Sequence, residues 1–216
     1  MIDLYCERVD SGLWSEPLNA ITNLAFVAAG LAMVRHIERW NHGNDRGALA
    51  LIVLMVAIGI GSGLFHTYAN SAAQLADVLP LLLFQVVFLC LYLRRNLGIA
   101  HGATITMVAV FLVLCLVARG WPQLLNGSLA YAPAWTALVL LGIHQGRRGH
   151  GPVLLLWAAG LFFLSLTFRS LDLALCASFP HGTHFLWHIL NSLVLVLCTL
   201  SVLPAQGRYH RYGRLR

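Results

Sequence analysis

The sequence predicts an all-α fold: a polytopic membrane protein built as a bundle of seven transmembrane helices. Of its 216 residues, 59% are hydrophobic and only 10% are charged, and the mean hydropathy is +0.75. A typical soluble domain is about 25% charged. The apolar residues also gather in runs close to the roughly 20 residues that a helix needs to cross a bilayer.

Each of seven apolar runs is expected to form one membrane-spanning helix. The fifth is the weakest, because polar residues, a glycine and Pro133 interrupt it. No soluble domain or clear repeat stands out, so residues 1–216 are expected to form one domain, with an acidic leader at 1–16 and a basic cytoplasmic tail at 204–216. The runs lie at about residues 17–34, 48–68, 73–93, 99–118, 124–143, 152–175 and 183–203.

Arginine placement predicts the orientation of the bundle. Only Arg8 and Arg119 fall on one side of a seven-span arrangement, and Arg169 lies inside the sixth run. The positive-inside rule therefore predicts a cytoplasmic C-terminus and an N-terminus outside. The dispersal of the arginines among membrane loops argues against a nucleic-acid surface as the reason for the net charge of +6. The other eleven arginines are Arg35, Arg39, Arg46, Arg94, Arg95, Arg147, Arg148, Arg208, Arg211, Arg214 and Arg216.

The few ionisable residues within the apolar runs are candidates for a functional site, because such groups are costly at membrane depth. Ser62 and His66 are four residues apart near the end of the second run. His184 and His188 have the same spacing at the start of the seventh, and on a helix each pair shares one face. Asp77 lies near the start of the third run. Because successive helices cross in opposite directions, all five residues are expected in the outer part of the bundle.

Three imidazoles suit zinc, which in catalytic sites keeps three protein ligands and one position for water. We expect His66, His184 and His188 to hold Zn²⁺. Asp77 is the candidate to accept the proton of the water. Ser62 is the candidate to hydrogen-bond a developing oxyanion, with helix packing among its neighbouring glycines as the competing interpretation.

Arg169 and Asp172 form a second polar pair, three residues apart in the sixth run. We expect them to neutralise each other across one helical turn. The alternative is that they face the outer cavity and contact a polar lipid head group.

The leader carries a cluster of acidic residues, and an oxygen-rich cluster of this kind can bind Ca²⁺. A solvated acidic segment is the alternative. Tyr5 and Trp14 in the same segment are expected to anchor it at the membrane interface. The candidate calcium ligands are Asp3, Glu7, Asp10 and Glu16.

Cys6 and Cys176 both fall at the outer edge of the bundle, where a disulfide is permitted. We predict that they pair. The other three cysteines lie within apolar runs and are expected to pack there.

Four segments of the chain resemble the alkaline ceramidase family, within the wider CREST superfamily of seven-helix membrane hydrolases that includes the adiponectin receptors. The combination of Ser-x3-His, Asp and His-x3-His is specific in a seven-span protein. The segments are YCE at 5–7, EPLNAITN at 16–23, GSGLFH at 61–66 followed eleven residues later by Asp77, and HFLWH at 184–188.

The resemblance implies a zinc ion held by the three histidines, with Ser62 and Asp77 assisting, and hydrolysis of a lipid amide to a fatty acid and an amine. Eukaryotic relatives look like Asp-Trp-Cys-Glu-x-Asn with a later Glu at their calcium site. The Asp and Asn positions of that pattern are Leu4 and Val9 here, and Glu16 is the candidate for the later Glu.

The leading hypothesis is therefore a zinc-dependent hydrolase that cleaves ceramide or another N-acyl lipid inside the membrane, with its site toward the non-cytoplasmic side. A non-enzymatic receptor or transporter with a structural metal site is the alternative. Structural zinc is normally closed by four protein ligands, which speaks against that alternative. A haem protein with facing histidines is a third hypothesis, which an absorption spectrum would test.

Overall fold

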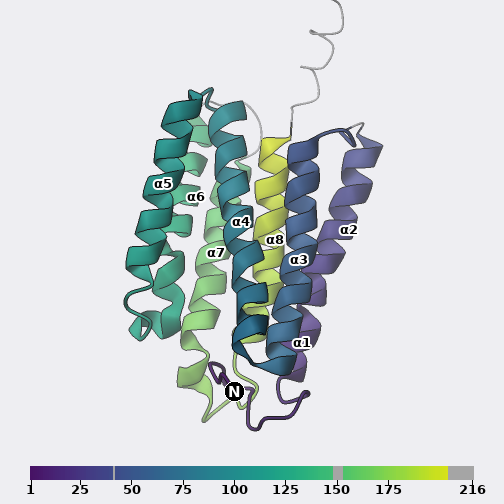
Figure 1. The fold of residues 1–216 in the computed structure, drawn as a ribbon, viewed down its shortest axis with the longest axis vertical. Coiled ribbons are helices and arrows are strands. Elements are labelled where there is room, and N and C mark those ends of the chain that lie inside the picture. Colours follow the sequence, from purple (N-terminus) through teal and green to yellow (C-terminus); the bar gives the residue numbers. More distant parts are fainter. Residues whose placement is uncertain (41, 148–152, 204–216) are drawn as a thin grey trace, which may run out of the picture.

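The structure, a computed structural model, describes residues 1–40, 42–147 and 153–203. Within these ranges it is helical and contains no strand, which confirms the all-α prediction (Figure 1). The predicted basic tail and Arg148 lie outside the described residues. The helices are α1 Pro17–Thr22, α2 Leu24–Arg39, α3 Arg46–Tyr68, α4 Ser71–Arg95, α5 His101–Ala118, η1 Leu124–Tyr131, α6 Ala132–Arg147, α7 Leu154–Leu171, η2 Leu173–Leu175 and α8 His184–Val202.

Seven helical segments of the described chain are long and apolar enough to cross a membrane, as predicted. The first span joins α1 and α2 and continues to Arg39, beyond the predicted end at residue 34. The fifth joins η1 and α6. Its weak hydropathy has a structural counterpart, because Leu125, Asn126 and Gly127 adopt positive φ angles of 53°, 52° and 72°. The span therefore begins as a kinked 3-10 segment.

Helix α8 lies at the centre of the bundle and contacts α1, α2, α3, α4 and α7. Helices α1 to α3 lie on one side of it, and α5 and α6 lie on the other (Figure 1). Helix α5 is the least buried of the spans. Because α8 touches most of the other helices, polar side chains on its first turns meet residues from several parts of the chain.

Two glycines of α3 bring that helix close to its neighbours. A Cβ atom at Gly61 would overlap the backbone of Ala76 in α4, and a Cβ atom at Gly59 would lie 2.9 Å from the carbonyl oxygen of Asn23. Larger residues at these positions would push the helices apart. The GIGSG sequence therefore sets the close packing around Ser62.

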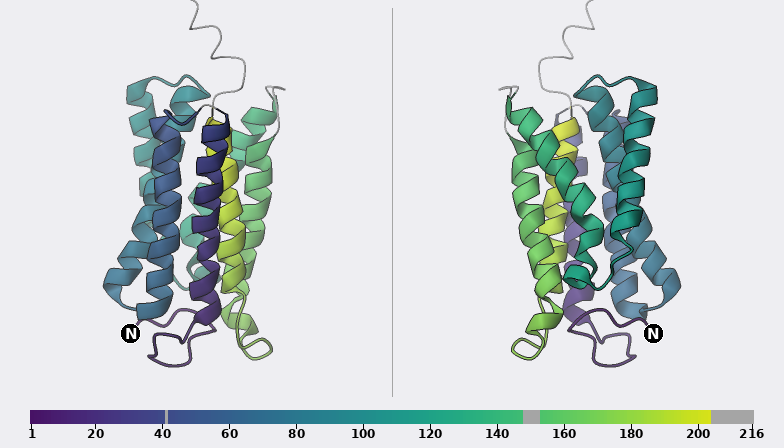
Figure 2. Two further views of the ribbon diagram at one scale, coloured as in Figure 1. Left: turned by 90° about the vertical axis from the view of Figure 1, so that its right-hand side faces the viewer. Right: turned by 90° about the vertical axis from the view of Figure 1, so that its left-hand side faces the viewer.

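The leader folds back under one end of the bundle, beside the connection between α7 and α8, as both views of Figure 2 show. The backbone N–H of Ile2 donates to the carbonyl of Ala69 at 2.8 Å, and Tyr5 is buried. Tyr5 is therefore not an interfacial anchor, contrary to the sequence prediction, because its ring is buried inside the protein. Trp14 is exposed. The end of α8 lies at the opposite end of the bundle (Figure 1). Which end faces the cytoplasm stays a prediction from the arginines.

At that opposite end, Asp45 caps α3 and pairs with α4. Its carboxylate accepts hydrogen bonds from the backbone N–H groups of Gly47 and Ala48 at 2.9 and 3.0 Å. The guanidinium of Arg95 donates to both carboxylate oxygens at 2.7 and 2.9 Å. Burial alone would raise the pKa of Asp45, but these hydrogen bonds outweigh it and hold the pKa below its usual value.

Candidate metal and active site

Three buried histidines meet near the leader end of the bundle. His66 lies in the last turn of α3, and His184 and His188 lie in the first two turns of α8. Each offers a ring nitrogen, and these atoms lie within 4.8 Å of one another. Among the described residues, this is the one group of three or more His, Cys, Asp or Glu side chains with such spacing. The structure thus brings the predicted ligands together.

The unpaired nitrogens of these rings suit a metal ion. His184 Nδ1 and His188 Nε2 are buried without a hydrogen-bond partner in the described chain. A buried polar atom left in that state is costly. A zinc ion bound between the imidazoles would satisfy both atoms. The donor set, three neutral imidazoles, is also one that zinc prefers.

A second partner orients two of the three rings, as is usual for metal-binding histidines. His66 Nδ1 lies 2.5 Å from Glu16 Oε2, and His188 Nδ1 lies 2.9 Å from Thr22 Oγ1. The Thr22 hydroxyl can in turn donate to the carbonyl of Leu18, 2.7 Å away. With Nδ1 carrying the proton in both rings, Nε2 of each is left with its lone pair for a metal.

Glu16 is a site residue whose role sequence reasoning missed, since it was assigned to calcium. Its carboxylate is buried and accepts a second bond from Arg8 Nε at 2.5 Å and a third from Asn19 Nδ2 at 3.1 Å. Burial alone would raise the pKa of Glu16, but the hydrogen bonds from His66, Asn19 and Arg8 outweigh it and lower the pKa. Glu16 therefore stays ionised and holds the ring of His66.

The remaining leader carboxylates do not gather around one point. Glu7 accepts the backbone N–H groups of Leu18 and Asn19 at 2.7 and 2.8 Å, which caps the start of α1. Asp3 and Asp10 are exposed. In the described chain, no three of the four leader acids offer ligand atoms within 4.8 Å of one another. Calcium binding by the leader stays a prediction, and Glu7 and Glu16 already have protein partners.

Ser62 and Asp77 line the same small cavity as His184 and His188. This cavity has a volume of about 20 Å³ and also touches Tyr5 and Arg169. The close contact at Gly61, described above, places Ser62 of α3 against the part of α4 that carries Asp77. The two predicted assisting residues therefore lie beside the histidines. Their catalytic roles stay a prediction.

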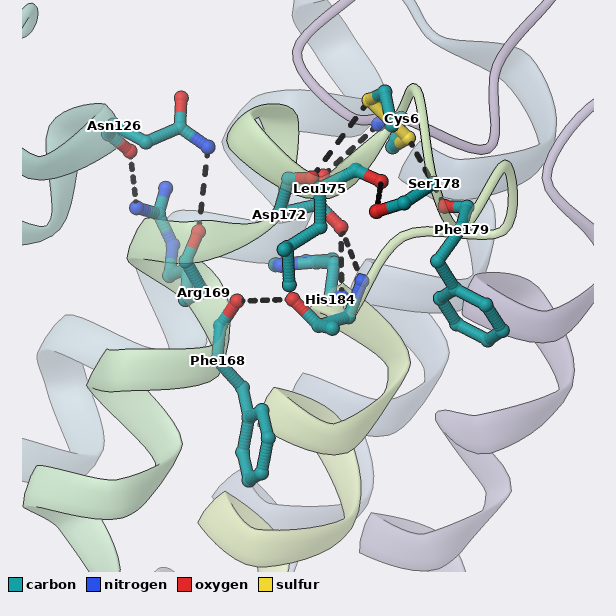
Figure 3. The surroundings of a disulfide bond; sticks show 11 residues. Cys6, Asn126, Phe168, Arg169, Asp172, Leu175, Ser178, Phe179 and His184 are labelled. Atoms are coloured by element: carbon teal, nitrogen blue, oxygen red, sulfur yellow. Dashed lines mark hydrogen bonds between the residues drawn. A yellow bond between two sulfur atoms is a disulfide. The ribbon is translucent and has the colours of Figure 1, made fainter.

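Asp172 and Arg169 do not pair with each other, contrary to the sequence prediction. Asp172 accepts the backbone N–H groups of Cys6, Thr183 and His184 at 2.9, 2.7 and 2.9 Å (Figure 3). Asp172 directly follows Leu171, the last residue of α7. Two N–H groups at the start of α8 and one in the leader donate to its carboxylate instead.

The structure joins Cys6 to Cys176 in a disulfide, with Cα atoms 5.4 Å apart (Figure 3). Gly182, at a φ of +62°, permits the tight approach of the α7–α8 connection, because a Cβ atom there would lie 2.6 Å from Cys6 Cβ. The leader is thus fastened to the connection between α7 and α8. One result is that the ring of Tyr5 stacks on His184 with centroids 3.6 Å apart.

Two further cavities adjoin the small one. A larger cavity of about 290 Å³ shares Tyr5, Asp77 and Arg169 with it and extends between α4, α5 and η1. An apolar cavity of about 50 Å³ shares Leu81 and Asn191 with it and extends among phenylalanines and leucines of α4 to α8. The site therefore connects a polar space with an apolar one.

A comparison with protein families finds that the Ceramidase family model matches residues 4–209 of the chain. No individually curated protein matches it.

Proposed function

The chain belongs to the ceramidase family, and on that premise we propose that it is a zinc-dependent hydrolase of ceramide-like N-acyl lipids. The products would be a fatty acid and a sphingoid-type amine. One observation carries the proposal: three buried imidazoles with ligand atoms within 4.8 Å of one another, beside a cavity lined by a serine and a carboxylate. Seven helical segments of the described residues are long and apolar enough to cross a membrane, which supports a site inside a membrane protein.

The side chains divide the work by their chemistry. His66, His184 and His188 would hold Zn²⁺. Glu16 would fix the orientation of the His66 ring through its hydrogen bond to Nδ1. When bound, zinc would polarise the amide carbonyl and lower the pKa of a water molecule.

Asp77 would take the proton of the attacking water and return it to the leaving amine, as a general base and then a general acid. Ser62 would donate a hydrogen bond to the carbonyl oxygen as negative charge develops there. Both side chains line the cavity that His184 and His188 also line, so the reacting amide would have to enter that cavity.

The two adjoining cavities suggest how a lipid would lie. The apolar cavity, lined by Phe84, Phe88 and Phe111 among others, suits an acyl chain. The larger cavity carries Gln74, Asn126 and Arg169 and suits a head group. By the positive-inside rule, the head group would then face the non-cytoplasmic side.

The test measures zinc and hydrolysis on the same purified samples. The protein should contain about one zinc per chain and release fatty acid from ceramide. His184→Ala should lose both. The control, His101→Ala, removes an exposed imidazole at the start of α5 and should change neither.

Ser62→Ala should keep zinc and lose about 10²–10³ in rate. Full zinc occupancy in His184→Ala would overturn the ligand assignment. Zinc binding without hydrolysis of any N-acyl lipid would favour a structural metal site in a receptor or transporter.

A further inference from the structure

Arg169 is a cation within a membrane-spanning helix that has no carboxylate partner. The described residues include all eight Asp and Glu side chains of the chain. The ion pairs among them are Arg8–Glu16 and Arg95–Asp45, and Glu16 also accepts a hydrogen bond from the neutral ring of His66. Charged groups at membrane depth usually pair with an opposite charge, so the charge of Arg169 stands out.

The partners of Arg169 in the described chain are neutral. Its Nη1 donates to the carbonyl of Asn126 at 2.6 Å (Figure 3). It also donates to Ser128 Oγ at 3.0 Å. Its Cζ lies 6.0, 5.4 and 5.8 Å from the ring centroids of Tyr5, Tyr131 and Trp187. Such contacts stabilise a guanidinium. Asp77, in the same two cavities, interacts with Arg169 electrostatically, but the two side chains form no direct ion pair.

The position of Arg169 matters as much as its charge. It lines both the small cavity of the histidines and the larger cavity beside it. A group bound there would lie next to the scissile amide. Exposed Arg119 adds a second positive charge to the larger cavity, and Asp77 is the one acidic residue among the described residues that line either cavity. The charge of the combined space therefore favours an anionic ligand.

We propose that Arg169 binds the carboxylate of an N-acyl amino acid, so that lipids of this class are preferred over neutral N-acyl amides. The proposal rests on the proposed hydrolase function and narrows its substrate class. In an N-acyl amino acid, one carbon separates the amide nitrogen from the carboxylate, so both fit a site where Arg169 adjoins the histidines. A guanidinium also matches a carboxylate in shape, with two parallel hydrogen bonds.

The reaction stays an amide hydrolysis. Water adds its oxygen to the acyl carbon, the bond from carbon to nitrogen breaks, and the nitrogen takes a proton. The products are a fatty acid and a free amino acid. No oxidant, reductant or further reactant is needed.

The experiment compares N-palmitoylglycine with N-palmitoylethanolamine, which has the same acyl chain and carries a hydroxymethyl group in place of the carboxylate. C16 ceramide is the third substrate. With zinc-loaded full-length protein in lipid nanodiscs, kcat/KM for the glycine conjugate should exceed that for the ethanolamine conjugate about 10- to 100-fold. One hydrogen-bonded contact between charged groups typically accounts for a ratio of this size.

Three variants assign the preference to Arg169. Arg169→Gln should bring the ratio close to 1, mainly by slowing hydrolysis of the glycine conjugate, and Arg169→Lys should retain part of the ratio. The matched control is Arg94→Gln, which removes the same charge at the far end of α4, where Arg94 donates to the carbonyl of Ile99. That variant should keep the wild-type ratio. Zinc content checks that each variant is folded.

The wild-type ratio needs no variant and can overturn the inference by itself. If the ethanolamine conjugate or ceramide is hydrolysed as fast as the glycine conjugate, the anionic preference is wrong while the hydrolase function stands. If zinc is bound and none of the three amides is cleaved, the hydrolase function itself fails.

Two variant outcomes also contradict the inference. Equal loss on all three substrates in Arg169→Gln would mean that Arg169 only holds the η1 segment in place. Palmitate, a reaction product, carries the same carboxylate chemistry. Weaker inhibition by palmitate in Arg169→Gln, with an unchanged substrate ratio, would assign Arg169 to the product instead of the head group.

Discussion

Replacing Glu16 with Gln should weaken zinc binding without removing a zinc ligand. Glu16 Oε2 lies 2.5 Å from His66 Nδ1, and Oε1 lies 2.5 Å from Arg8 Nε. A Gln side chain keeps the size and one acceptor oxygen, but its NH₂ group cannot accept a second bond. Either His66 or Arg8 therefore loses its partner, and the negative charge between them is gone.

The size of the effect follows from these contacts. Loss of a hydrogen-bonding partner behind a metal-binding histidine typically costs 10- to 100-fold in metal affinity, which is about 1.4–2.7 kcal/mol. Arg8 is also buried, and its guanidinium donates to the carbonyl of His66 at 2.8 Å. Breaking a buried ion pair typically costs about 3–5 kcal/mol, so the variant should also unfold at lower temperature.

The assay is a zinc titration against a competing chelator, with thermal unfolding measured on the metal-free protein. Glu16→Gln should raise the Kd for zinc about 10- to 100-fold, and excess zinc should restore much of the activity. The control is Glu38→Gln, which removes an exposed carboxylate near the end of α2. If Glu16→Gln folds and binds zinc with the wild-type Kd, Glu16 does not orient His66 and the reasoning fails.

Three further predictions concern other parts of the molecule. Asp77→Asn should retain zinc and lose about 10²–10⁴ in hydrolysis rate; measured loss of zinc would make Asp77 a ligand instead. Peptide mapping without reductant should recover Cys6 linked to Cys176, and Cys6→Ser should lower stability by about 2–4 kcal/mol; two free thiols in the wild type would contradict this. Because folding lowers the pKa of Asp45, its pairing with Arg95 stabilises the protein above the unfolded pKa of about 4 and is lost as pH falls below it through the folded value. Asn caps helices about as well as Asp, so Asp45→Asn should flatten this acid dependence of thermal unfolding and cost at most about 1 kcal/mol at neutral pH; an unchanged acid profile would show that the pair contributes nothing.

The sequence alone determined the seven spans and the convergence of the histidines. Hydropathy is a local property, so apolar runs reveal membrane helices without knowledge of their neighbours. The four-residue spacing from His184 to His188 puts both on one helical face, and the alternating direction of successive spans brings His66 to their level. These deductions need only helical geometry and the thickness of a bilayer.

Only the tertiary structure decided what surrounds those histidines. Glu16 contacts His66, 50 residues away, and Asp172 contacts Cys6, 166 residues away, because the leader folds back onto the bundle. Sequence reasoning assigned Glu16 to calcium from the acidic cluster and the family pattern, and it assigned Asp172 to Arg169 from their spacing along the chain. The partner of a buried charged group depends on all the donors and acceptors that folding brings near it. Because backbone N–H groups bind Asp172, Arg169 does not pair with it and lines the cavity instead.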